Sequence, residues 1–115
     1  MFKYKVLSLV SFMILFFVML QVDAYINELP LFNKIIYVDA GHGGVDPGAV
    51  YNDIYEETIT LEISKKLRDA LEKKGAVVYM TREEDYDLSD PKAYLRKRND
   101  LSKRAKLIND SLCDM

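Results

Sequence analysis

The hydrophobic positions of the chain fall into one long run and several short ones. The long run covers residues 6–20, carries no charged residue and follows Lys3 and Lys5. A basic start and an apolar stretch form the pattern of a secretory signal, and Val22 and Ala24 supply the small residues of a cleavage site. We therefore expect residues 1–24 to be a signal peptide cleaved after Ala24. Because the run is short for the roughly 20 residues of a membrane span, an uncleaved signal anchor is the second interpretation, and a buried core helix is the third.

Two short apolar segments predict β-strands. Residues 34–39 contain β-branched and aromatic side chains and run straight into glycine, and residues 76–80 have a similar composition. The first segment is almost continuously apolar, which is typical of a strand buried on both faces in a parallel or mixed sheet. Residues 25–33, with Pro30, are expected to be a linker. Residues 41–53 are expected to be a loop, since five of them are Gly or Pro.

Two longer segments show the spacing of α-helices. Residues 57–74 open with acidic residues and close with two lysines before Gly75. A second helix is expected to begin with Asp90 as N-cap and Pro91 in its first turn, and to run to about Asn109. Between the second strand and this helix, residues 81–90 predict a polar loop. The apolar positions of the two helices are Ile59, Ile63, Leu67, Ala70 and Leu71, then Leu95, Leu101, Ala105 and Ile108.

The order strand–helix–strand–helix predicts an α/β fold. It favours a layered mixed or parallel sheet flanked by helices. A sheet of only two strands is marginal for independent stability. Residues 110–115 follow the second helix and look like the lead-in to a third strand. We therefore expect the domain to be incomplete at its C-terminus.

Composition and charge exclude several functions. The 115 residues carry a net charge of −2, so nothing favours binding to nucleic acid or to an anionic membrane surface. The single cysteine, Cys113, has no partner for an internal disulfide, and no role is assigned to it. A cluster of basic residues near the C-terminus is partly offset by aspartates and predicts a solvated helix face. Its members are Arg96, Lys97, Arg98, Lys103, Arg104 and Lys106.

The candidate chemistry lies in the loop after the first strand. His42 is the only histidine, has glycine on both sides, and is followed by Glu56 and Glu57 at the start of the first helix. Open α/β sheets place ligands at the carboxyl ends of strands, and catalytic zinc commonly takes His and Glu among three protein ligands. On these residues alone, a loop histidine without a ligand role is the alternative. A phosphate-binding loop is a weaker one, because the glycines lack the G-x-G-x-x-G spacing and no Walker lysine follows.

The sequence of the same loop also resembles a known family. Residues 39–49, Asp-Ala-Gly-His-Gly-Gly-Val-Asp-Pro-Gly-Ala, are similar to the signature of the zinc-dependent N-acetylmuramoyl-L-alanine amidases. Residues 55–63 resemble that family's glutamate-led helix start, residues 75–85 its second strand with Thr81-Arg82 at the end, and residues 101–109 the following helix. The resemblance covers about residues 34–115 and is greatest to the germination-specific, spore-cortex branch. It implies the three-layer α/β fold of these enzymes.

The resemblance implies two zinc ligands in this chain. His42 matches the family's first zinc histidine, and Glu56 matches its zinc glutamate. A second zinc histidine in the next strand and a catalytic glutamate near the end of the domain are also implied, and neither has a counterpart in this sequence. No catalytic or substrate-binding residue is therefore assigned within the chain.

Four further polar residues are expected to have structural or solvated roles. Glu57 is interpreted as a solvated residue of the first helical turn, favoured there by the helix dipole. Asp39, Asp46 and Arg82 match motif positions of the family. We expect the aspartates to cap the turn and Arg82 to pair with neighbouring carboxylates, with substrate contact as the alternative for all three.

The resemblance implies a Zn²⁺-dependent hydrolase that cleaves the amide between N-acetylmuramic acid and L-alanine in peptidoglycan, in spore cortex maturation and germination. Residues 34–115 would be the N-terminal part of its catalytic domain. With two of three ligands and no base, the chain is expected to be a truncated amidase, inactive alone. Half of a split amidase and a signal-anchored, non-catalytic interaction protein are the alternatives. The signal predicts export to the cell envelope or forespore–cortex space, with membrane contact only through an uncleaved N-terminal segment.

Overall fold

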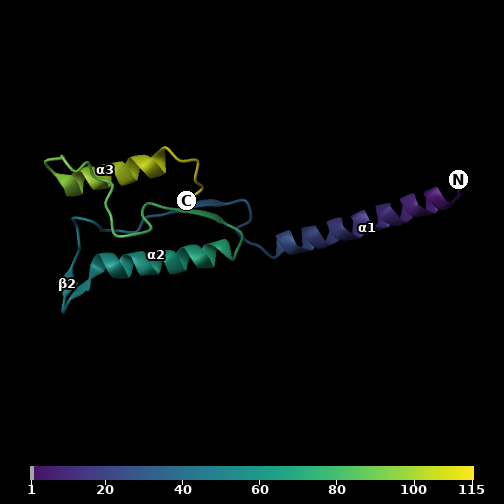
Figure 1. The fold of residues 1–115 in the computed structure, drawn as a ribbon, viewed down its shortest axis with the longest axis horizontal. Helices are drawn as coiled ribbons and strands as arrows, with labels where there is room; N and C mark the ends of the chain where they lie inside the picture. The colour runs from purple at the N-terminus through teal and green to yellow at the C-terminus, as the bar shows by residue number, and fades with distance from the viewer. Residues whose placement is uncertain (1) are drawn as a thin grey trace.

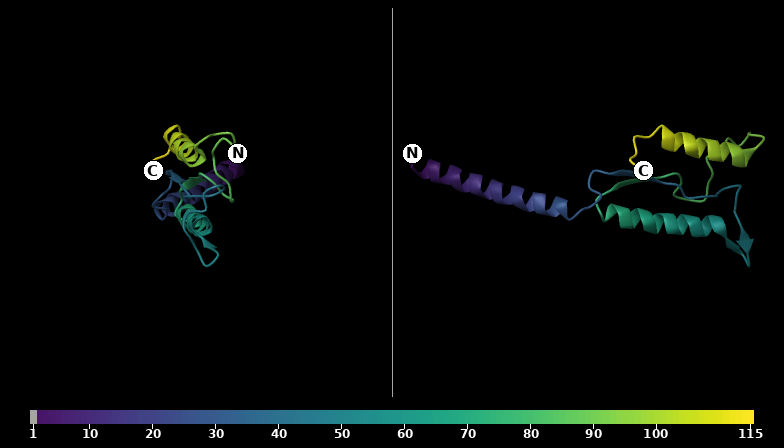
Figure 2. Two further views of the ribbon diagram at one scale, coloured as in Figure 1. Left: turned by 90° about the vertical axis from the view of Figure 1, so that its left-hand side faces the viewer. Right: turned by 180° about the vertical axis from the view of Figure 1, so that it is seen from behind.

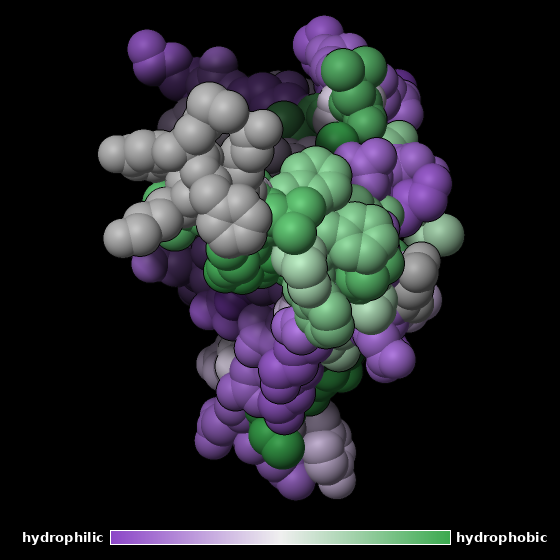
Figure 3. Space-filling view, turned by 90° about the vertical axis from the view of Figure 1, so that its right-hand side faces the viewer, coloured by the Kyte–Doolittle hydropathy of each residue, from purple (hydrophilic) through white to green (hydrophobic). Residues whose placement is uncertain are grey.

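The computed structural model describes residues 2–115, which form three helices and four short strands (Figure 1). The first helix, α1 (Phe2–Asn27), extends away from the rest of the chain (Figure 1 and the right-hand view of Figure 2). It includes a 21-residue apolar span, Val6–Ile26, none of which is buried. Seen from the N-terminal end of α1, apolar side chains of the helix gather in front of a largely hydrophilic body (Figure 3). This span is long enough to cross a bilayer.

The helix α1 extends beyond the predicted signal segment. It continues through Ala24 to Asn27, so the first residues of the predicted linker are helical. The rest of that segment packs onto the domain. The Leu31 N–H donates to the carbonyl of Lys74 at 2.9 Å, and the Leu31 side chain packs against the apolar core. Residues 28–33 connect this helix to the sheet without regular secondary structure.

The two predicted strands form the centre of the domain. Strands β1 (Ile35–Val38) and β4 (Val77–Met80) pair in parallel, with Ile36 opposite Val78. On the other edge of β1, the Asp114 N–H donates to the Ile35 carbonyl and the Tyr37 N–H donates to the Met115 carbonyl, both at 2.7 Å. The last residues therefore lie along β1 as a third strand would, as the sequence predicts.

The helices α2 (Glu56–Glu72) and α3 (Arg96–Asn109) cover opposite faces of this sheet (Figures 1 and 2). The prediction of a layered α/β fold with parallel strands is thus confirmed. The apolar core between sheet and α2 is small. Its buried members are Ile36, Val38 and Ala76, with Leu31, Leu71, Val78 and Met80 packed around them.

The side of α2 that faces the sheet includes Leu71 but leaves most of the predicted apolar positions exposed. Ser64 is buried there, whereas Ile59, Ile63 and Leu67 are 46%, 59% and 46% exposed. The spacing of the apolar residues predicted the helix correctly, but it did not predict which side of the helix packs against the sheet.

A β-hairpin lies inside the predicted loop 41–53 and extends just past it. Strands β2 (Val50–Tyr51) and β3 (Ile54–Tyr55) pair antiparallel. Both turn residues, Asn52 and Asp53, have positive φ angles, of 48° and 59°. Two residues with positive φ between short strands are the geometry of a type I′ turn. The hairpin runs directly into α2, so Glu56 is the first residue of the helix.

The helix α3 begins later than predicted. Asp90 accepts hydrogen bonds from the N–H groups of Lys92 and Ala93, to its carboxylate and carbonyl respectively. These bonds close an isolated turn, and Leu95, with φ −116° and ψ 77°, interrupts the helical backbone before Arg96. The prediction that Asp90 caps the helix is therefore wrong. It caps the turn before it.

Candidate functional site

The loop that follows β1 has an unusual backbone. His42 has a φ of 62°, and it is followed by Gly43 and Gly44 with φ of 112° and 61°. A Cβ atom on Gly43 would lie 2.7 Å from the Tyr86 carbonyl oxygen, and one on Gly44 2.7 Å from the backbone N of Asp87. Glycine is required at both positions by conformation and by space.

This loop brings His42 and Glu56 together. The Nε2 atom of His42 lies 3.4 Å from Oε2 of Glu56, the first residue of α2. The same Glu56 oxygen accepts the Ala49 N–H at 2.8 Å, which fixes the carboxylate beside the ring. Both side chains are partly exposed, at 32% and 44%. The structure therefore places the two sequence-predicted ligands side by side in an accessible position.

The other ring nitrogen of His42 faces Asp46. Nδ1 lies 3.1 Å from Oδ2 of Asp46, and the second oxygen of that carboxylate lies 2.6 Å from Nζ of Lys97 on α3. The Gly48 N–H also donates to this oxygen, at 3.3 Å. Burial opposes ionisation of Asp46, but the hydrogen bonds from Lys97, His42 and Gly48 outweigh it and lower the pKa of its carboxyl. Asp46 caps the turn as predicted, and it also contacts the histidine.

Arg82 lies beneath the loop and is fully buried. Its guanidinium donates to the carbonyls of Ala40, Gly41 and Glu57 at 2.7–2.9 Å. The expectation of a structural role fits this burial, but the expected carboxylate partners are wrong, because Arg82 donates mainly to backbone carbonyls. Burial and the nearby charge of Arg104 lower the pKa of the guanidinium. A planar group with five donors can satisfy several converging carbonyls at once.

Arg104 is a second buried arginine at the same strand ends. It donates to the carbonyls of Ala40 at 2.6 Å and His42 at 2.7 Å, and to the carboxylates of Asp39 at 2.8 Å and Asp100 at 2.7 Å. Burial works against its charge, but these two carboxylates raise its pKa overall. The prediction that Arg104 belongs to a solvated basic face is therefore wrong. Two aspartates provide the charge that a buried arginine requires.

Two aspartates from the loop after β4 bind the backbone of Gly44 and Val45 from the other side. The Gly44 N–H donates to Asp85 at 2.7 Å, and the Val45 N–H donates to Asp87 at 3.1 Å. Asp87 also bonds to Ser89 and forms an ion pair with Arg96 at 2.9 Å. Although burial opposes its ionisation, the hydrogen bonds from Ser89 and Val45 and the charge of Arg96 lower the pKa of Asp87 to about 2.

Glu57 is not the solvated residue that the sequence predicted. Its Oε2 atom is buried and has no hydrogen-bond partner within the described residues. Burial, together with the negative charge of Asp85, raises the pKa of this carboxyl. The first turn of α2 therefore presents Glu56 outward to His42 and Glu57 inward.

A model of the N-acetylmuramoyl-L-alanine amidase family matches residues 36–115. This match covers all of the central sheet except Ile35, both flanking helices and the whole site described above. The chain belongs to that family. The predicted resemblance is thus confirmed, and with it the amidase-type fold.

Three relatives of this amidase chain illustrate the similarity. It is 48% identical over 91 residues to the germination-specific N-acetylmuramoyl-L-alanine amidase of Bacillus subtilis (strain 168), covering 76% of this chain and 38% of that protein. It is 42% identical over 96 residues to the probable cell wall amidase LytH of Staphylococcus saprophyticus, covering 76% and 33%. The structure of the CwlD amidase from Clostridioides difficile, in complex with the GerS lipoprotein, matches with a TM-score of 0.66 and 39% identity, covering 72% and 45%. The amidase chain thus spans less than half the length of these relatives.

The donors of the amidase site fit zinc in type and spacing. Two ligands about 2.1 Å from a tetrahedral zinc are roughly 3.4 Å apart, and Nε2 of His42 and Oε2 of Glu56 have this separation. Within the described residues, no group of three His, Cys, Asp or Glu side chains converges. Two donors side by side are one fewer than the three protein ligands that catalytic zinc usually takes.

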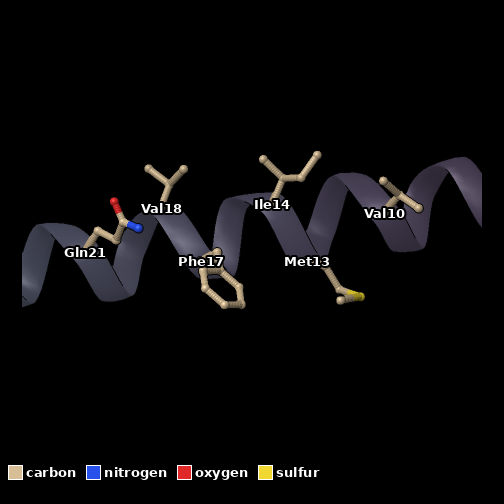
Figure 4. Close-up of a pocket in the computed structure, with 6 residues that line it drawn as sticks. All are labelled: Val10, Met13, Ile14, Phe17, Val18 and Gln21. Atoms are coloured by element: carbon tan, nitrogen blue, oxygen red, sulfur yellow. The ribbon is translucent and has the colours of Figure 1, made fainter.

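An apolar groove outside this site lies on α1. Its six lining residues all come from that one helix, and Figure 4 shows their side chains pointing from several sides of it. The groove is apolar and remote from His42, which makes it a feature of the membrane-length span rather than part of the amidase site. Its residues are Val10, Met13, Ile14, Phe17, Val18 and Gln21.

Proposed function

We propose that this chain carries the first two zinc ligands of a peptidoglycan amidase, His42 and Glu56. The observation that carries the proposal is the 3.4 Å approach of their Nε2 and Oε2 atoms at the carboxyl end of β1. Family membership supplies the reaction class, hydrolysis of the amide between N-acetylmuramic acid and L-alanine. When bound, zinc would lower the pKa of a water molecule and polarise the scissile carbonyl.

The residues of this chain serve that chemistry by holding the ligands. Arg82 and Arg104 bind the carbonyls of the loop from Ala40 to His42, which sets the position of the histidine backbone. The Ala49 N–H orients the Glu56 carboxylate. A site held in this way loses little order when the metal binds, because its ligands are already near their bound positions.

The substrate class follows from the relatives. We assign peptidoglycan, and specifically the spore cortex, because the germination-specific amidase of Bacillus subtilis is 48% identical over the shared residues. The second zinc histidine and the catalytic glutamate would come from the part of the family domain that this chain does not span. Whether that part lies on the same polypeptide or on a second one, the two ligands here would hold zinc weakly without it.

The helix α1 would direct the chain out of the cytoplasm. Its 21-residue apolar span begins after a basic start and is unburied, as a signal peptide or signal anchor requires. Export would bring the site to its peptidoglycan substrate. Retention of α1 would add attachment to the membrane.

The test uses the chain joined to the remaining part of the domain from the germination-specific relative. Zinc per polypeptide is measured by mass spectrometry of the metal, and activity by release of stem peptides from peptidoglycan. We expect His42→Ala and Glu56→Gln to lose both, and Glu62→Gln, an exposed glutamate on the same helix, to lose neither. Unchanged zinc content in both site variants would refute the ligand assignment. Zinc binding without peptide release would refute the substrate.

A further inference from the structure

We propose that Asp46 is a positioning residue for His42, and that Lys97 on α3 holds Asp46 in place. The carboxylate of Asp46 fixes the ring through Nδ1, so that Nε2 faces Glu56 and a metal bound there. The presence of a metal at Nε2 rests on the proposed function, whereas the hydrogen bond between Asp46 and the ring is independent of it.

The first step is the direction of the hydrogen bond. An ionised carboxylate only accepts hydrogen bonds, so its contact with Nδ1 at 3.1 Å requires the proton to be on Nδ1. In a neutral ring Nε2 is then unprotonated and carries the free lone pair. Oε2 of Glu56 lies 3.4 Å from Nε2 with no hydrogen bond between them, so Asp46 is the ring's one hydrogen-bond partner among the described residues. Histidines that bind metals commonly donate their other N–H to a carboxylate in this way, which sets both tautomer and ring orientation.

The second step is what holds Asp46. Its other oxygen lies 2.6 Å from Nζ of Lys97 and 3.3 Å from the Gly48 nitrogen. Its backbone is closed against Gly43 by a pair of hydrogen bonds of 2.8 and 3.1 Å. The carboxylate therefore has a donor on both oxygens and sits on a fixed turn. It cannot rotate away from the ring without losing Lys97.

The third step is that α3 contacts His42 by two routes. Arg104 donates to the His42 carbonyl at 2.7 Å, and Lys97, two turns earlier on the same helix, reaches the ring through Asp46. The helix α3 thus positions both the backbone and the side chain of His42. This arrangement gives Lys97 a role that its exposure of 66% would not suggest.

An alternative role for Asp46 is only to cap the turn at Gly48. Asp46→Asn separates the two roles, because an asparagine side chain keeps the size and the acceptor for Gly48. Lys97 and Gly48 both donate to one side of the group, so the asparagine oxygen would turn toward them and its NH₂ would face Nδ1. The ring would then take the tautomer with the proton on Nε2.

The experiment is nitrogen NMR of the full chain in detergent micelles with ¹⁵N-labelled histidine. His42 is the only histidine, so its ring gives a single, unambiguous pair of resonances. At a pH where the ring is neutral, we expect the Nδ1–H tautomer in the wild type and the Nε2–H tautomer in Asp46→Asn. Lys97→Met should move the tautomer ratio in the same direction by a smaller amount. Lys103→Met, an exposed lysine on the same helix, is the matched control and should leave the ratio unchanged.

Zinc titration of the same samples tests the metal separately. Loss of a carboxylate behind a ligating histidine weakens metal binding about tenfold or more, so the zinc concentration that shifts the Nε2 resonance should rise by that factor in Asp46→Asn. A wild-type ring already in the Nε2–H form, or one whose tautomer is the same in Asp46→Asn, would overturn the positioning role. A wild-type ring in the expected tautomer that zinc does not shift would refute the zinc ligand, while Asp46 would keep its control of the tautomer.

Discussion

The middle of the sheet and the carboxyl ends of its strands are stabilised by different forces. In the middle, Ile36, Val38 and Ala76 form a small apolar core. At the strand ends, Arg82 and Arg104 are buried among carbonyls and carboxylates. Apolar burial is non-directional and tolerates small displacements, whereas each hydrogen bond at the strand ends requires a defined distance and angle. The functional loop is therefore placed by directional contacts, while most of the apolar surface of α2 is left uncovered.

The largest expected effect is removal of a buried charge from the strand ends. Arg104→Met leaves the carboxylates of Asp39 and Asp100 without their main partner, and breaking a buried pair in this way costs about 3–5 kcal/mol. Denaturant unfolding of the chain measures the loss. Arg98→Met, an exposed arginine of the same helix, should change the free energy of unfolding by only about 0.5 kcal/mol or less. Equal losses in the two variants would mean that the buried network is not what stabilises this end.

The second prediction compares two identical changes in the apolar regions. Ile36→Ala removes a side chain that is 7% exposed and should cost about 2 kcal/mol or more. Ile63→Ala removes one that is 59% exposed and should cost about 0.5 kcal/mol or less. The measurement is again the free energy of unfolding. A large cost for Ile63→Ala would show that the apolar stripe of α2 is covered in solution.

The third prediction concerns pH and the loop after β4. The pKa of Asp87 is about 2 in the fold and 3.8 as the ordinary value, so the folded state holds this proton less tightly than the unfolded one. Its contribution to stability is therefore complete above pH 3.8 and is lost as the pH falls toward about 2. The shift corresponds to about 2 kcal/mol.

The matched comparison for this prediction is Asp87→Asn, which should be less stable than the wild type at neutral pH and should lose that difference in acid. Thermal unfolding at a series of pH values measures both. Glu62→Gln, at an exposed position, should follow the wild-type curve. An Asp87→Asn curve parallel to the wild type throughout would contradict the assigned contacts.

The smallest expected effect is at Glu57, the one side chain among the described residues with a buried polar atom that lacks a hydrogen-bond partner. Its folded pKa is raised above the ordinary value of 4.5, so the folded state loses stability as the pH rises from that value through the folded pKa. Glu57→Gln removes this loss and should make the chain slightly more stable at neutral pH, with no gain in acid. A destabilised variant would indicate that the ionised carboxylate has a partner, such as a bound cation.

Local signals in the sequence predicted the strands and α2 well. The apolar segments at 34–39 and 76–80 contain β1 and β4, and the α2 helix ends within two residues of its predicted limit. The proximity of the two candidate residues was also anticipated, because His42 follows a predictable strand and Glu56 starts a predictable helix. The choice of Glu56 over Glu57 came from the resemblance to the amidase family. The I′ turn of the hairpin had a weak signal in Asn52-Asp53, which the glycine-rich composition before it obscured.

The buried charges were not predictable in the same way. Arg104 lies in a basic stretch, and its burial depends on Asp39, which is 65 residues away in the sequence. Lys97 and Asp46 are likewise separated by the whole of α2 and β4. The start of α3 was misplaced because Asp90 satisfies a turn as well as it would a helix. The partners of Arg104 and Lys97 are brought close only by the fold, so no local sequence pattern predicts these contacts.

The attachment of α1 and the His42–Glu56 pair lie at opposite ends of the domain. The segment after α1 packs at the C-terminal end of α2, where Leu31 bonds to Lys74, whereas His42 and Glu56 lie at the opposite end of that helix. Seventeen residues of α2 correspond to about 25 Å. A chain tethered to a bilayer by α1 would hold His42 and Glu56 on the far side of the domain, at about that distance from the attachment point. The length of one helix would then set how far these two side chains stand from the membrane.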